Sequence, residues 1–287
     1  MTADLTVAAL LAEALGELRT SPAGKEPGAT SELDTQLLLA HVLGVPRARL
    51  HSHPGGVLVP EQARRFRELL GRRAAGEPLA YLTGVKEFWS LRLAVSPAVL
   101  IPRPESELLV ERALALHNAA AAHVADLGTG SGALALALAS ERPDWQIVAT
   151  DVSEDALAVA RANAATLGLG RVQFRQGEWF APLGQARFNL IISNPPYVAA
   201  DDPAMSALRF EPRRALTPGG EALECLRTLA RGAPRHLQRA GWLLLEHGAG
   251  QAEDVRRELV LAGFGHVRSH RDLAGHERMT EGQHDQI

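Results

Sequence analysis

The sequence predicts an α/β protein in which a small bundle of helices precedes a mainly parallel sheet covered by helices on both faces. Three observations predict it. Apolar residues recur at helical spacing through roughly the first 75 residues. The period changes to two near Leu91, and short apolar runs alternate with helical stretches after Ala121. We expect a helical domain at residues 1–78, a β-hairpin linker at residues 79–104 and an α/β domain at residues 105–287.

The helical domain is predicted to contain three helices. Apolar spacing predicts the first over residues 7–18. Ser31 with Asp34 suits the start of the second, and Gly44 suits its end. Proline favours the first position of a helix, so Pro60 predicts the start of the third. No group of titratable side chains in this part suggests chemistry, and we expect a domain that packs or docks a partner.

The linker and the α/β domain follow in order. Leu91, Leu93 and Val95 alternate with more polar neighbours and predict a hairpin strand. Glu105 and Glu107 suit the start of a helix, because its N-terminal end is positive. Strands are then predicted at 123–127, 146–150, 172–176, 188–193 and 242–246, helices at 133–140, 154–167, 222–237 and 251–262, and two short strands in roughly the last 25 residues.

Composition excludes several classes of protein. The net charge is −3, from 30 basic and 33 acidic residues, which argues against binding nucleic acid mainly through phosphates. Cys225 is the single cysteine, so neither an internal disulfide nor a cysteine zinc site can form. His51 and His53 lie in a predicted loop without a convergent partner, and no metal site is expected. No apolar run is long enough to span a membrane, and we expect a soluble cytoplasmic protein.

A glycine-rich loop, Asp126–Gly132, lies between the first predicted strand of the sheet and a helix. Glycines there permit a tight turn and a close approach of the backbone to a ligand. The spacing of Gly128, Gly130 and Ala133 fits both a dinucleotide and S-adenosylmethionine. Asp151 ends the next strand, where a carboxylate accepts hydrogen bonds from ribose hydroxyls.

Two further features favour S-adenosylmethionine. Asp126 lies just before the loop, where a carboxylate would attract a ligand that carries a sulfonium and an amino group rather than a pyrophosphate. Glu178 and Trp179 follow the third predicted strand and could flank an adenine. Each feature alone is weak, since Trp179 could equally pack in the core.

The sharpest motif is Asn194-Pro195-Pro196-Tyr197, directly after the fourth predicted strand of the sheet. Ligands of open α/β sheets bind beyond the carboxyl ends of the strands. Two prolines make a stiff turn whose carbonyls remain acceptors, while Asn194 adds a side-chain carbonyl and Tyr197 a flat face. Such a site suits a planar NH₂ group, because two acceptors help its lone pair localise and stabilise the charge that develops on nitrogen. The alternative interpretation is a rigid structural turn.

Together these residues resemble the release factor glutamine methyltransferase family over nearly the whole chain. The linker resembles that family at Tyr81–Gly84, Glu87–Phe88 and Leu100–Pro104. The following domain resembles it at Asp126–Gly132, Asp151, Ser193–Val198, Phe210–Pro212 and Leu245–Gly248. Departures are small: Ser106 and Ser131 stand where threonine is common, Glu178 stands where aspartate is commoner, and residues 275–279 fit loosely.

The resemblance implies a Rossmann-like class I methyltransferase domain, a hairpin linker and a helical domain that docks the protein substrate. It implies transfer of a methyl group from S-adenosyl-L-methionine to the side-chain amide nitrogen (N5) of the glutamine in the Gly-Gly-Gln motif of class I peptide chain release factors. The cofactor contacts carried over are Gly128, Thr129, Gly130, Ser131, Gly132, Asp151, Trp179 and Asn194. The catalytic and substrate-binding residues carried over are Asn194, Pro195, Pro196 and Tyr197, with Phe88 and Arg103 closing over the site.

Other functions stay open at this point. An adenine N6-methyltransferase acting on DNA or RNA could use the same tetrapeptide on a flipped base, although the net charge of −3 argues against it. A glutamine in a ribosomal protein could replace the release factor as substrate. A non-enzymatic adaptor is disfavoured by the intact motif at residues 194–197. We expect a monomer that binds neither membrane nor nucleic acid.

Overall fold

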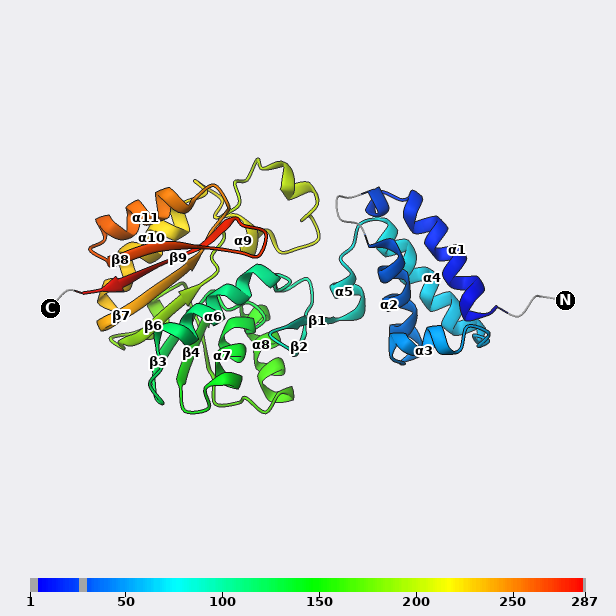
Figure 1. Cartoon of the computed structure of the whole chain (residues 1–287), viewed down its shortest axis with the longest axis horizontal. Coiled ribbons are helices and arrows are strands. Elements are labelled where there is room, and N and C mark those ends of the chain that lie inside the picture. The colour runs from blue at the N-terminus through cyan, green and yellow to red at the C-terminus, as the bar shows by residue number, and fades with distance from the viewer. Residues whose placement is uncertain (1–4, 26–29, 286–287) are drawn as a thin grey trace. The chain divides into compact units, whose positions relative to one another are not determined.

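The computed structural model describes residues 5–25 and 30–285 (Figure 1). The chain divides into two compact units, one that ends at Gly84 and one that begins at Val85. The three-part division with boundaries after residues 78 and 104 stays a prediction. Residues 1–4, 26–29 and 286–287, which it includes, lie outside the described residues.

The first unit consists of helices around one apolar core. These are α1 (Val7–Thr20), α2 (Ser31–Leu43), α3 (Arg47–Ser52), α4 (Pro60–Ala74) and α5 (Leu79–Thr83). Their inward side chains, among them Leu10, Leu38 and Phe66, form a single buried cluster. The three predicted helices are confirmed as α1, α2 and α4, and Gly44 ends α2 in the left-handed conformation.

Three details of this unit differ from the prediction. Helix α2 begins at Ser31, so the capping position belongs to Thr30, whose hydroxyl donates to the Asp34 carboxylate at 2.8 Å. Helices α3 and α5 have six and five residues, too few to show a helical period in the sequence. His51 therefore lies in a short helix, α3, and not in a loop.

The second unit is built on a seven-stranded sheet. Its strands are β3 (His123–Leu127), β4 (Gln146–Asp151), β5 (Gln173–Gln176), β6 (Phe188–Ser193), β7 (Leu237–Glu246), β8 (Gly265–Arg271) and β9 (Glu277–His284). Their order is β5-β4-β3-β6-β7-β9-β8. The strands from β5 to β7 are parallel, and β9 and β8 are added antiparallel at one edge. The predicted mainly parallel sheet is confirmed, as are the two final strands.

Helices cover both faces of this sheet. Helices α6 (Glu107–Leu116), α7 (Ala133–Glu141) and α8 (Glu154–Thr166) lie on one face, and α10 (Glu224–Gly232) and α11 (Ala252–Leu261) on the other (Figure 1). Successive residues of a strand point to opposite faces. Leu190 and Ile192 accordingly join the core beneath the first set of helices, while Ile191 joins the core beneath the second.

One predicted helix extends further along the chain than the helix in the structure. The sequence predicts a helix over 222–237, but α10 ends at Gly232 and a short 3-10 turn follows over Ala233–Arg235. Pro234 lacks the N–H that a continuing helix would need. The strand that follows begins already at Leu237 and is longer than the predicted 242–246.

The strand order places two loops next to each other. Strand β3 pairs with β4 on one side and with β6 on the other, so the strand order reverses at β3. The carboxyl ends of β3 and β6 therefore open at a topological switch point, where open α/β sheets bind ligands. The glycine loop leaves from β3 and the Asn194 motif leaves from β6.

A two-stranded hairpin opens the second unit. Strands β1 (Val85–Phe88) and β2 (Leu91–Ala94) pair antiparallel, which confirms the strand predicted around Leu91. Its two turn residues, Trp89 and Ser90, have φ values of 50° and 59°. The buried Asn163 joins this hairpin to helix α8, since its side chain exchanges hydrogen bonds with the backbone N–H and carbonyl of Ala94 at 2.7 and 3.0 Å.

Candidate active site

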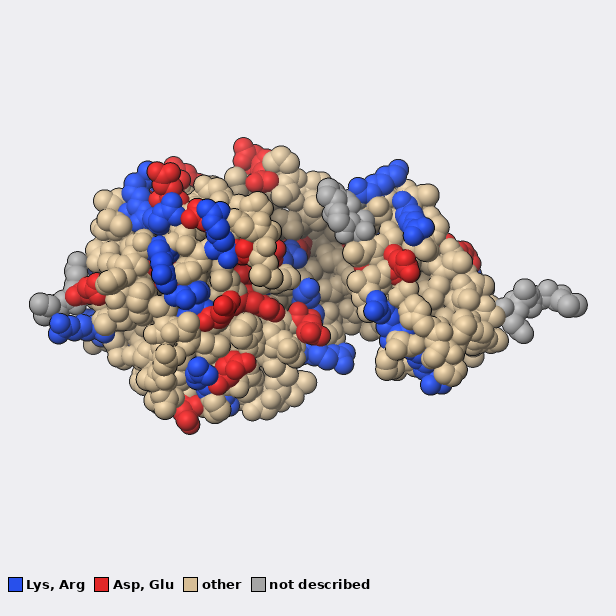
Figure 2. All heavy atoms as spheres, viewed as in Figure 1, with Lys and Arg blue, Asp and Glu red and all other residues tan. Residues whose placement is uncertain are grey.

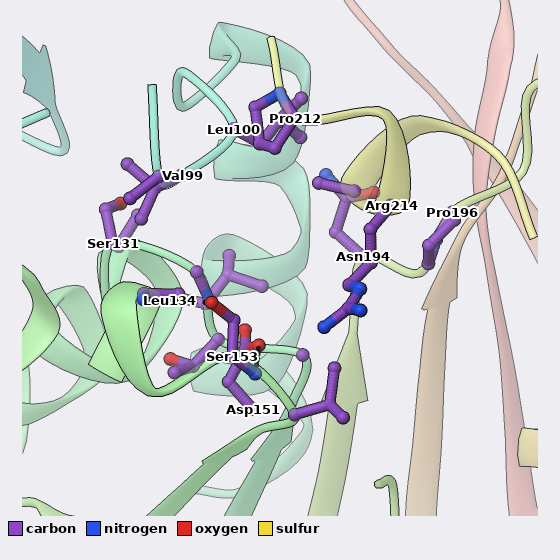
Figure 3. Close-up of a pocket in the computed structure, with 18 of the residues that line it drawn as sticks. Val99, Leu100, Ser131, Leu134, Asp151, Ser153, Asn194, Pro196, Pro212 and Arg214 are labelled. Carbon is purple, nitrogen blue, oxygen red and sulfur yellow. Dashed lines mark hydrogen bonds between the residues drawn. The ribbon is translucent and has the colours of Figure 1, made fainter. Parts of the chain in front are cut away.

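A cavity of about 530 Å³ lies at the carboxyl edge of the sheet, within the second unit. Figure 3 shows its two sides. Ser131, Leu134, Asp151 and Ser153 lie on one side, around the glycine loop and the end of β4. Asn194, Pro196 and Arg214 lie on the other, and Val99, Leu100 and Pro212 border it above.

The glycine loop is held in a conformation that requires glycine. Gly128, Gly130 and Gly132 have φ values of 76°, 56° and 84°, a region that other residues rarely enter. The N–H groups of Gly128 and Thr129 both donate to the carbonyl of Thr150 at 2.9 Å. The loop is thus fastened to β4, and its outer surface faces the cavity.

Asp151 both shapes this loop and lines the cavity. Its Oδ2 accepts from the N–H of Gly130 at 2.9 Å, and its Oδ1 accepts from the N–H of Ser153 at 2.9 Å. A carboxylate oxygen can accept more than one hydrogen bond. Asp151 can therefore hold the loop and still accept from the hydroxyls of a sugar in the cavity.

Trp179 lines the cavity next to the loop. It has a φ of 45°, and its carbonyl accepts from the hydroxyl of Thr150 at 3.2 Å. A side chain on Gly128 would meet the Trp179 ring at 3.5 Å, so that ring lies directly over the loop backbone. This arrangement fits a planar, weakly polar group such as an adenine.

Gly132 is required for packing and does not line the cavity. It caps the N-terminus of α7, and a Cβ there would come within 3.1 Å of Leu136 and 3.2 Å of Ala160. Its predicted contact with the cofactor stays a prediction.

Asp126 lies beneath the loop and is fully buried. Its Oδ2 accepts from the Thr129 hydroxyl at 2.6 Å and from the N–H of Ala135 at 3.3 Å. Burial raises the pKa of this carboxyl to about 7. The expected direct approach to a cationic ligand is not what the structure has, because the side chain fastens the loop to α7 from behind.

The residues present fit an S-adenosyl cofactor. The cavity combines a carboxylate suited to ribose with an aromatic wall suited to adenine. Within the described part of the chain, Oδ1 of Asp126 is buried beneath the loop and has no hydrogen-bond partner. A positive charge on a ligand above the loop would favour the ionised form of this carboxyl, even without direct contact.

Only part of the motif that follows β6 lines the cavity. Asn194 and Pro196 line the cavity, whereas Pro195 is buried and Tyr197 does not reach it. The Tyr197 hydroxyl donates to Oε1 of Glu246 at 3.2 Å, and burial raises the pKa of this phenol. The side-chain amide of Gln251 donates to the carbonyl of Tyr197 at 3.0 Å. The stacking role predicted for Tyr197 stays a prediction.

A chain of hydrogen bonds connects Asn194 to the end of β7. The Asn194 amide nitrogen donates to the Ser106 hydroxyl oxygen at 3.0 Å, and that hydroxyl donates to Oε2 of Glu246 at 2.5 Å. Glu246 is fully enclosed, and burial raises its pKa to about 7. Next to it, His247 is buried, and desolvation lowers its pKa.

The segment after the hairpin forms a further wall. Phe88, Val99 and Leu100 line the cavity. Arg103 does not line it but forms an ion pair with Glu211, whose other oxygen accepts from the N–H of Ile101 at 3.1 Å. The carboxylate of Glu211 thus fastens the linker to the segment that carries Pro212.

Several lining residues have no individual signal in the sequence. Arg214 is in the short helix α9 (Arg213–Leu216), and its side chain extends into the cavity (Figure 3). Thr217, Pro218 and Cys225 also line the cavity. The Phe210–Pro212 motif marks their neighbourhood, but only the folded chain shows which following side chains face inward.

The residues that the structure describes contain no group of three or more His, Cys, Asp or Glu side chains that could hold a metal ion. In the same residues, 5–25 and 30–285, no helix has both the length and the apolar character needed to cross a membrane.

Comparison with known proteins follows the same division. The PrmC N-terminal domain model matches residues 10–84, and the methyltransferase small domain model matches residues 104–239. The T. thermophilus 16S rRNA N2 G1207 methyltransferase, solved with AdoMet and guanosine, shares the fold with a TM-score of 0.52 and 19% identity. That match covers 69% of this chain and 49% of the other.

Two curated relatives are much more similar in sequence. The release factor glutamine methyltransferase of Pseudomonas aeruginosa is 47% identical, over 88% of this chain and 93% of that protein. The release factor glutamine methyltransferase of Vibrio cholerae is 44% identical, over 98% of each chain. The chain therefore belongs to the release factor glutamine methyltransferase family, whose methyl donor is S-adenosyl-L-methionine.

Proposed function

We propose that this chain methylates the side-chain amide nitrogen (N5) of the glutamine in the Gly-Gly-Gln motif of class I peptide chain release factors. The observation that carries the proposal is the presence of Asn194 and Pro196 on the cavity wall opposite the glycine loop (Figure 3). When bound, S-adenosyl-L-methionine supplies an electrophilic methyl group on its sulfonium.

The donor site is made by the residues of the loop side. We assign Gly128, Thr129, Gly130 and Ser131 to contacts through the backbone, Asp151 to the ribose hydroxyls and Trp179 to the adenine. The fixed loop and its close backbone approach support this assignment, since no side chain intervenes at the glycines. Gly132 acts through the packing of α7.

The acceptor site is made by Asn194 and the turn that follows it. Asn194 is bonded to Ser106 through its side-chain nitrogen, so its Oδ1 is the atom that can accept from a substrate. We assign Oδ1 of Asn194 as the acceptor for one hydrogen of the glutamine NH₂ group, and a backbone carbonyl of the turn over residues 194–197 as the acceptor for the other. Acceptors fixed in advance hold that nitrogen in line with the methyl group and stabilise the positive charge that develops on it. The proton can leave after the transfer, so a tuned general base is not required.

The helical unit is proposed to dock the release factor, as the family resemblance implies, and its described residues contain no group of His, Cys, Asp or Glu side chains that could hold a metal ion. We further propose a cytoplasmic monomer that does not bind nucleic acid. Lys and Arg are interspersed with Asp and Glu on the face drawn in Figure 2, and the net charge is −3, whereas phosphate binding favours a basic excess.

The test is transfer of labelled methyl from S-adenosyl-L-methionine to a purified release factor. A release factor whose Gly-Gly-Gln glutamine is changed serves as control, with duplex and single-stranded DNA and a ribosomal protein fraction alongside. We expect label on the unchanged release factor alone. Label on DNA would make the motif an adenine site, and label on the ribosomal fraction would keep the chemistry but change the substrate.

A further inference from the structure

Three side chains from distant parts of the chain meet beside the acceptor site. Ser106 precedes α6, Asn194 follows β6 and Glu246 ends β7. Ser106 is 4% exposed and Glu246 is 2% exposed, so both are shielded from water. Neither belongs to the residues that the resemblance assigns to cofactor or substrate.

Each hydrogen bond in this group has a defined direction above pH 7, where the Glu246 carboxyl, whose pKa is about 7, is ionised. The Glu246 carboxylate, when ionised, can only accept, and it accepts from the Ser106 hydroxyl through Oε2. Its other oxygen, Oε1, accepts from the Tyr197 hydroxyl. The hydroxyl proton of Ser106 is therefore used in the bond to Glu246, and the Ser106 oxygen can accept a hydrogen bond from a third group.

That third group is Asn194. Its side-chain nitrogen donates to the Ser106 oxygen at 3.0 Å. A flipped amide would instead bring Oδ1 against the Ser106 oxygen with no proton between them, and two acceptors would face each other. Such an unsatisfied pair is costly inside a protein. The orientation of the Asn194 amide is thus set by Ser106.

We propose that Ser106 and Glu246 are positioning residues that turn the carbonyl end of Asn194 toward the substrate. The inference rests on the proposed function, since it specifies how Asn194 selects its partner. With Oδ1 outward, the site accepts hydrogen bonds and suits the NH₂ of glutamine. A glutamate carboxylate at the same place has only acceptor oxygens. These would face Oδ1 of Asn194, which is also an acceptor, so glutamate would not bind there.

The first test removes the hydroxyl while keeping the fold. Ser106→Ala is expected to lower kcat on the release factor by about 10- to 100-fold, the loss of one hydrogen bond in a buried charged chain. The donor affinity, measured by calorimetry with S-adenosylhomocysteine, is expected to stay unchanged. Ser106→Thr retains the hydroxyl and is expected to restore kcat to within about threefold.

Ser269→Ala is a matched control. Ser269 also links side chains in this unit, through Thr280 and Arg256 at 2.8 and 2.7 Å, but it does not line the cavity. It is expected to keep the kcat of the unsubstituted chain. Ser106→Ala with unchanged kcat would overturn the proposal, and so would an equal loss of kcat in Ser106→Thr.

Glu246→Gln tests the other end of the chain of hydrogen bonds. A glutamine can accept from Ser106 with its one oxygen, but its NH₂ then meets Tyr197, which must accept where it previously donated. We expect a loss of kcat smaller than that of Ser106→Ala, with unchanged donor affinity. A full loss of donor affinity would instead point to collapse of the cavity and contradict the assignment.

A second measurement does not depend on methyl transfer. In ¹⁵N-labelled protein, the side-chain NH₂ signals of Asn194, identified by their loss in Asn194→Asp, should exchange slowly with solvent while bonded to Ser106. Ser106→Ala should speed this exchange, and Ser106→Thr should not. If the unsubstituted chain failed to methylate a release factor but showed this pattern, the proposed function would fail and the amide orientation would stand. Identical exchange in Ser106→Ala would refute the orientation itself.

Discussion

Asn194 is the side chain on which the proposed transfer depends most, because it is placed to touch the substrate amide while Ser106 orients it. Asn194→Ala removes one of the two acceptors for the substrate NH₂ and leaves the loop side of the cavity intact. We expect transfer to fall by about 100-fold or more, the usual cost of removing a preorganised polar group at the reacting atoms. Donor binding should change little. Calorimetry with S-adenosylhomocysteine and the methyl-transfer assay, run in parallel, measure the two effects.

Asn189→Ala is the matched control for that substitution. Asn189 lies on strand β6, which leads into Asn194, and bonds to the N–H of His123 and to Gln238 away from the cavity. Its loss should not lower kcat. Comparable loss of donor binding and transfer in Asn194→Ala would contradict the division of roles between the two sides of the cavity.

Asp126 gives a pH-dependent prediction. Burial raises the pKa of its carboxyl from 3.8 to about 7, so the folded state favours the protonated form. Its contribution to the free energy of unfolding is therefore fully present below pH 3.8 and is lost as the pH rises to about 7, on the order of 4 kcal/mol in all. Asp126→Asn removes this titration. The variant should gain stability relative to the unsubstituted chain between about pH 4 and pH 7, and the difference should be constant above about pH 7.

Urea unfolding at a series of pH values measures this difference. Tryptophan fluorescence follows the unfolding of the second unit, because that unit contains all four tryptophans, Trp89, Trp145, Trp179 and Trp242. Other titrating groups, such as His247 with its lowered pKa, are common to both chains and cancel in the difference. A difference that is independent of pH would show that Asp126 titrates normally.

The sequence predicts the residues that line the cavity better than those that support them. Gly128, Asp151 and Asn194 are predicted and do line it, because glycine loops and strand ends are local features. Glu246 is expected near the site, as the end of a strand that supports it, and Ser106 belongs to the family pattern, but their contact with each other is not predicted. Those two residues are 140 positions apart, and no local pattern shows that their side chains touch.

At the scale of elements, the β1–β2 turn carries local strain. Two-residue hairpin turns of this kind favour Asn-Gly, because both positions have positive φ. Here they are Trp89 and Ser90, at 50° and 59°. Ser90 is exposed, so Ser90→Gly relieves strain without removing packing. We expect the free energy of unfolding of the second unit to rise by about 0.5–1 kcal/mol.

The same urea titration by tryptophan fluorescence measures this gain. Arg92→Gly is the matched control in the same hairpin, since Arg92 is an exposed residue in the extended backbone of β2. A glycine inside a strand adds only freedom to the unfolded chain, so this variant should lower stability. If Ser90→Gly also lowered stability, the turn would not be strained in solution.

Elements are predictable where their signal is long and periodic. Strand β3 and helix α7 are apolar runs with glycine next to one end, and their positions are predicted to within a residue. The end of α10 is missed because its apolar pattern continues through Pro234 into β7. Short helices such as α3 are missed because fewer than two turns carry too few residues to define a face.

At the scale of the whole molecule, ligand binding should raise the free energy of unfolding of the second unit and leave that of the helical unit unchanged. S-adenosylhomocysteine at about 100 times its Kd should raise the free energy of unfolding by about 2.7 kcal/mol, measured by tryptophan fluorescence. In Asp151→Ala the same concentration should give a smaller increase, because Asp151 holds the loop and is assigned to the ribose. An equal increase in the free energy of unfolding in both chains would show that Asp151 does not contribute to donor binding.

The overall architecture follows from the alternation of strands and helices, whereas the short helix α5 is seen only in the folded chain. The change of period near Leu91 marks the hairpin, but α5 continues the helical unit to Thr83, and the second unit begins at Val85. That helix is too short to be recognised against the strand pattern that follows it. Packing, and not local preference, decides to which unit such a segment belongs.

The place of β3 in the sheet has a consequence for synthesis on the ribosome. The helical unit is contiguous up to Gly84 and closes through local contacts, so it can form while the rest of the chain is still being made. Strand β3 gains β4 soon after it emerges, but its other neighbour, β6, begins only at Phe188. Until then one edge of the nascent sheet is open, and Glu246 arrives later still. The acceptor site is therefore among the last parts of the enzyme to be completed.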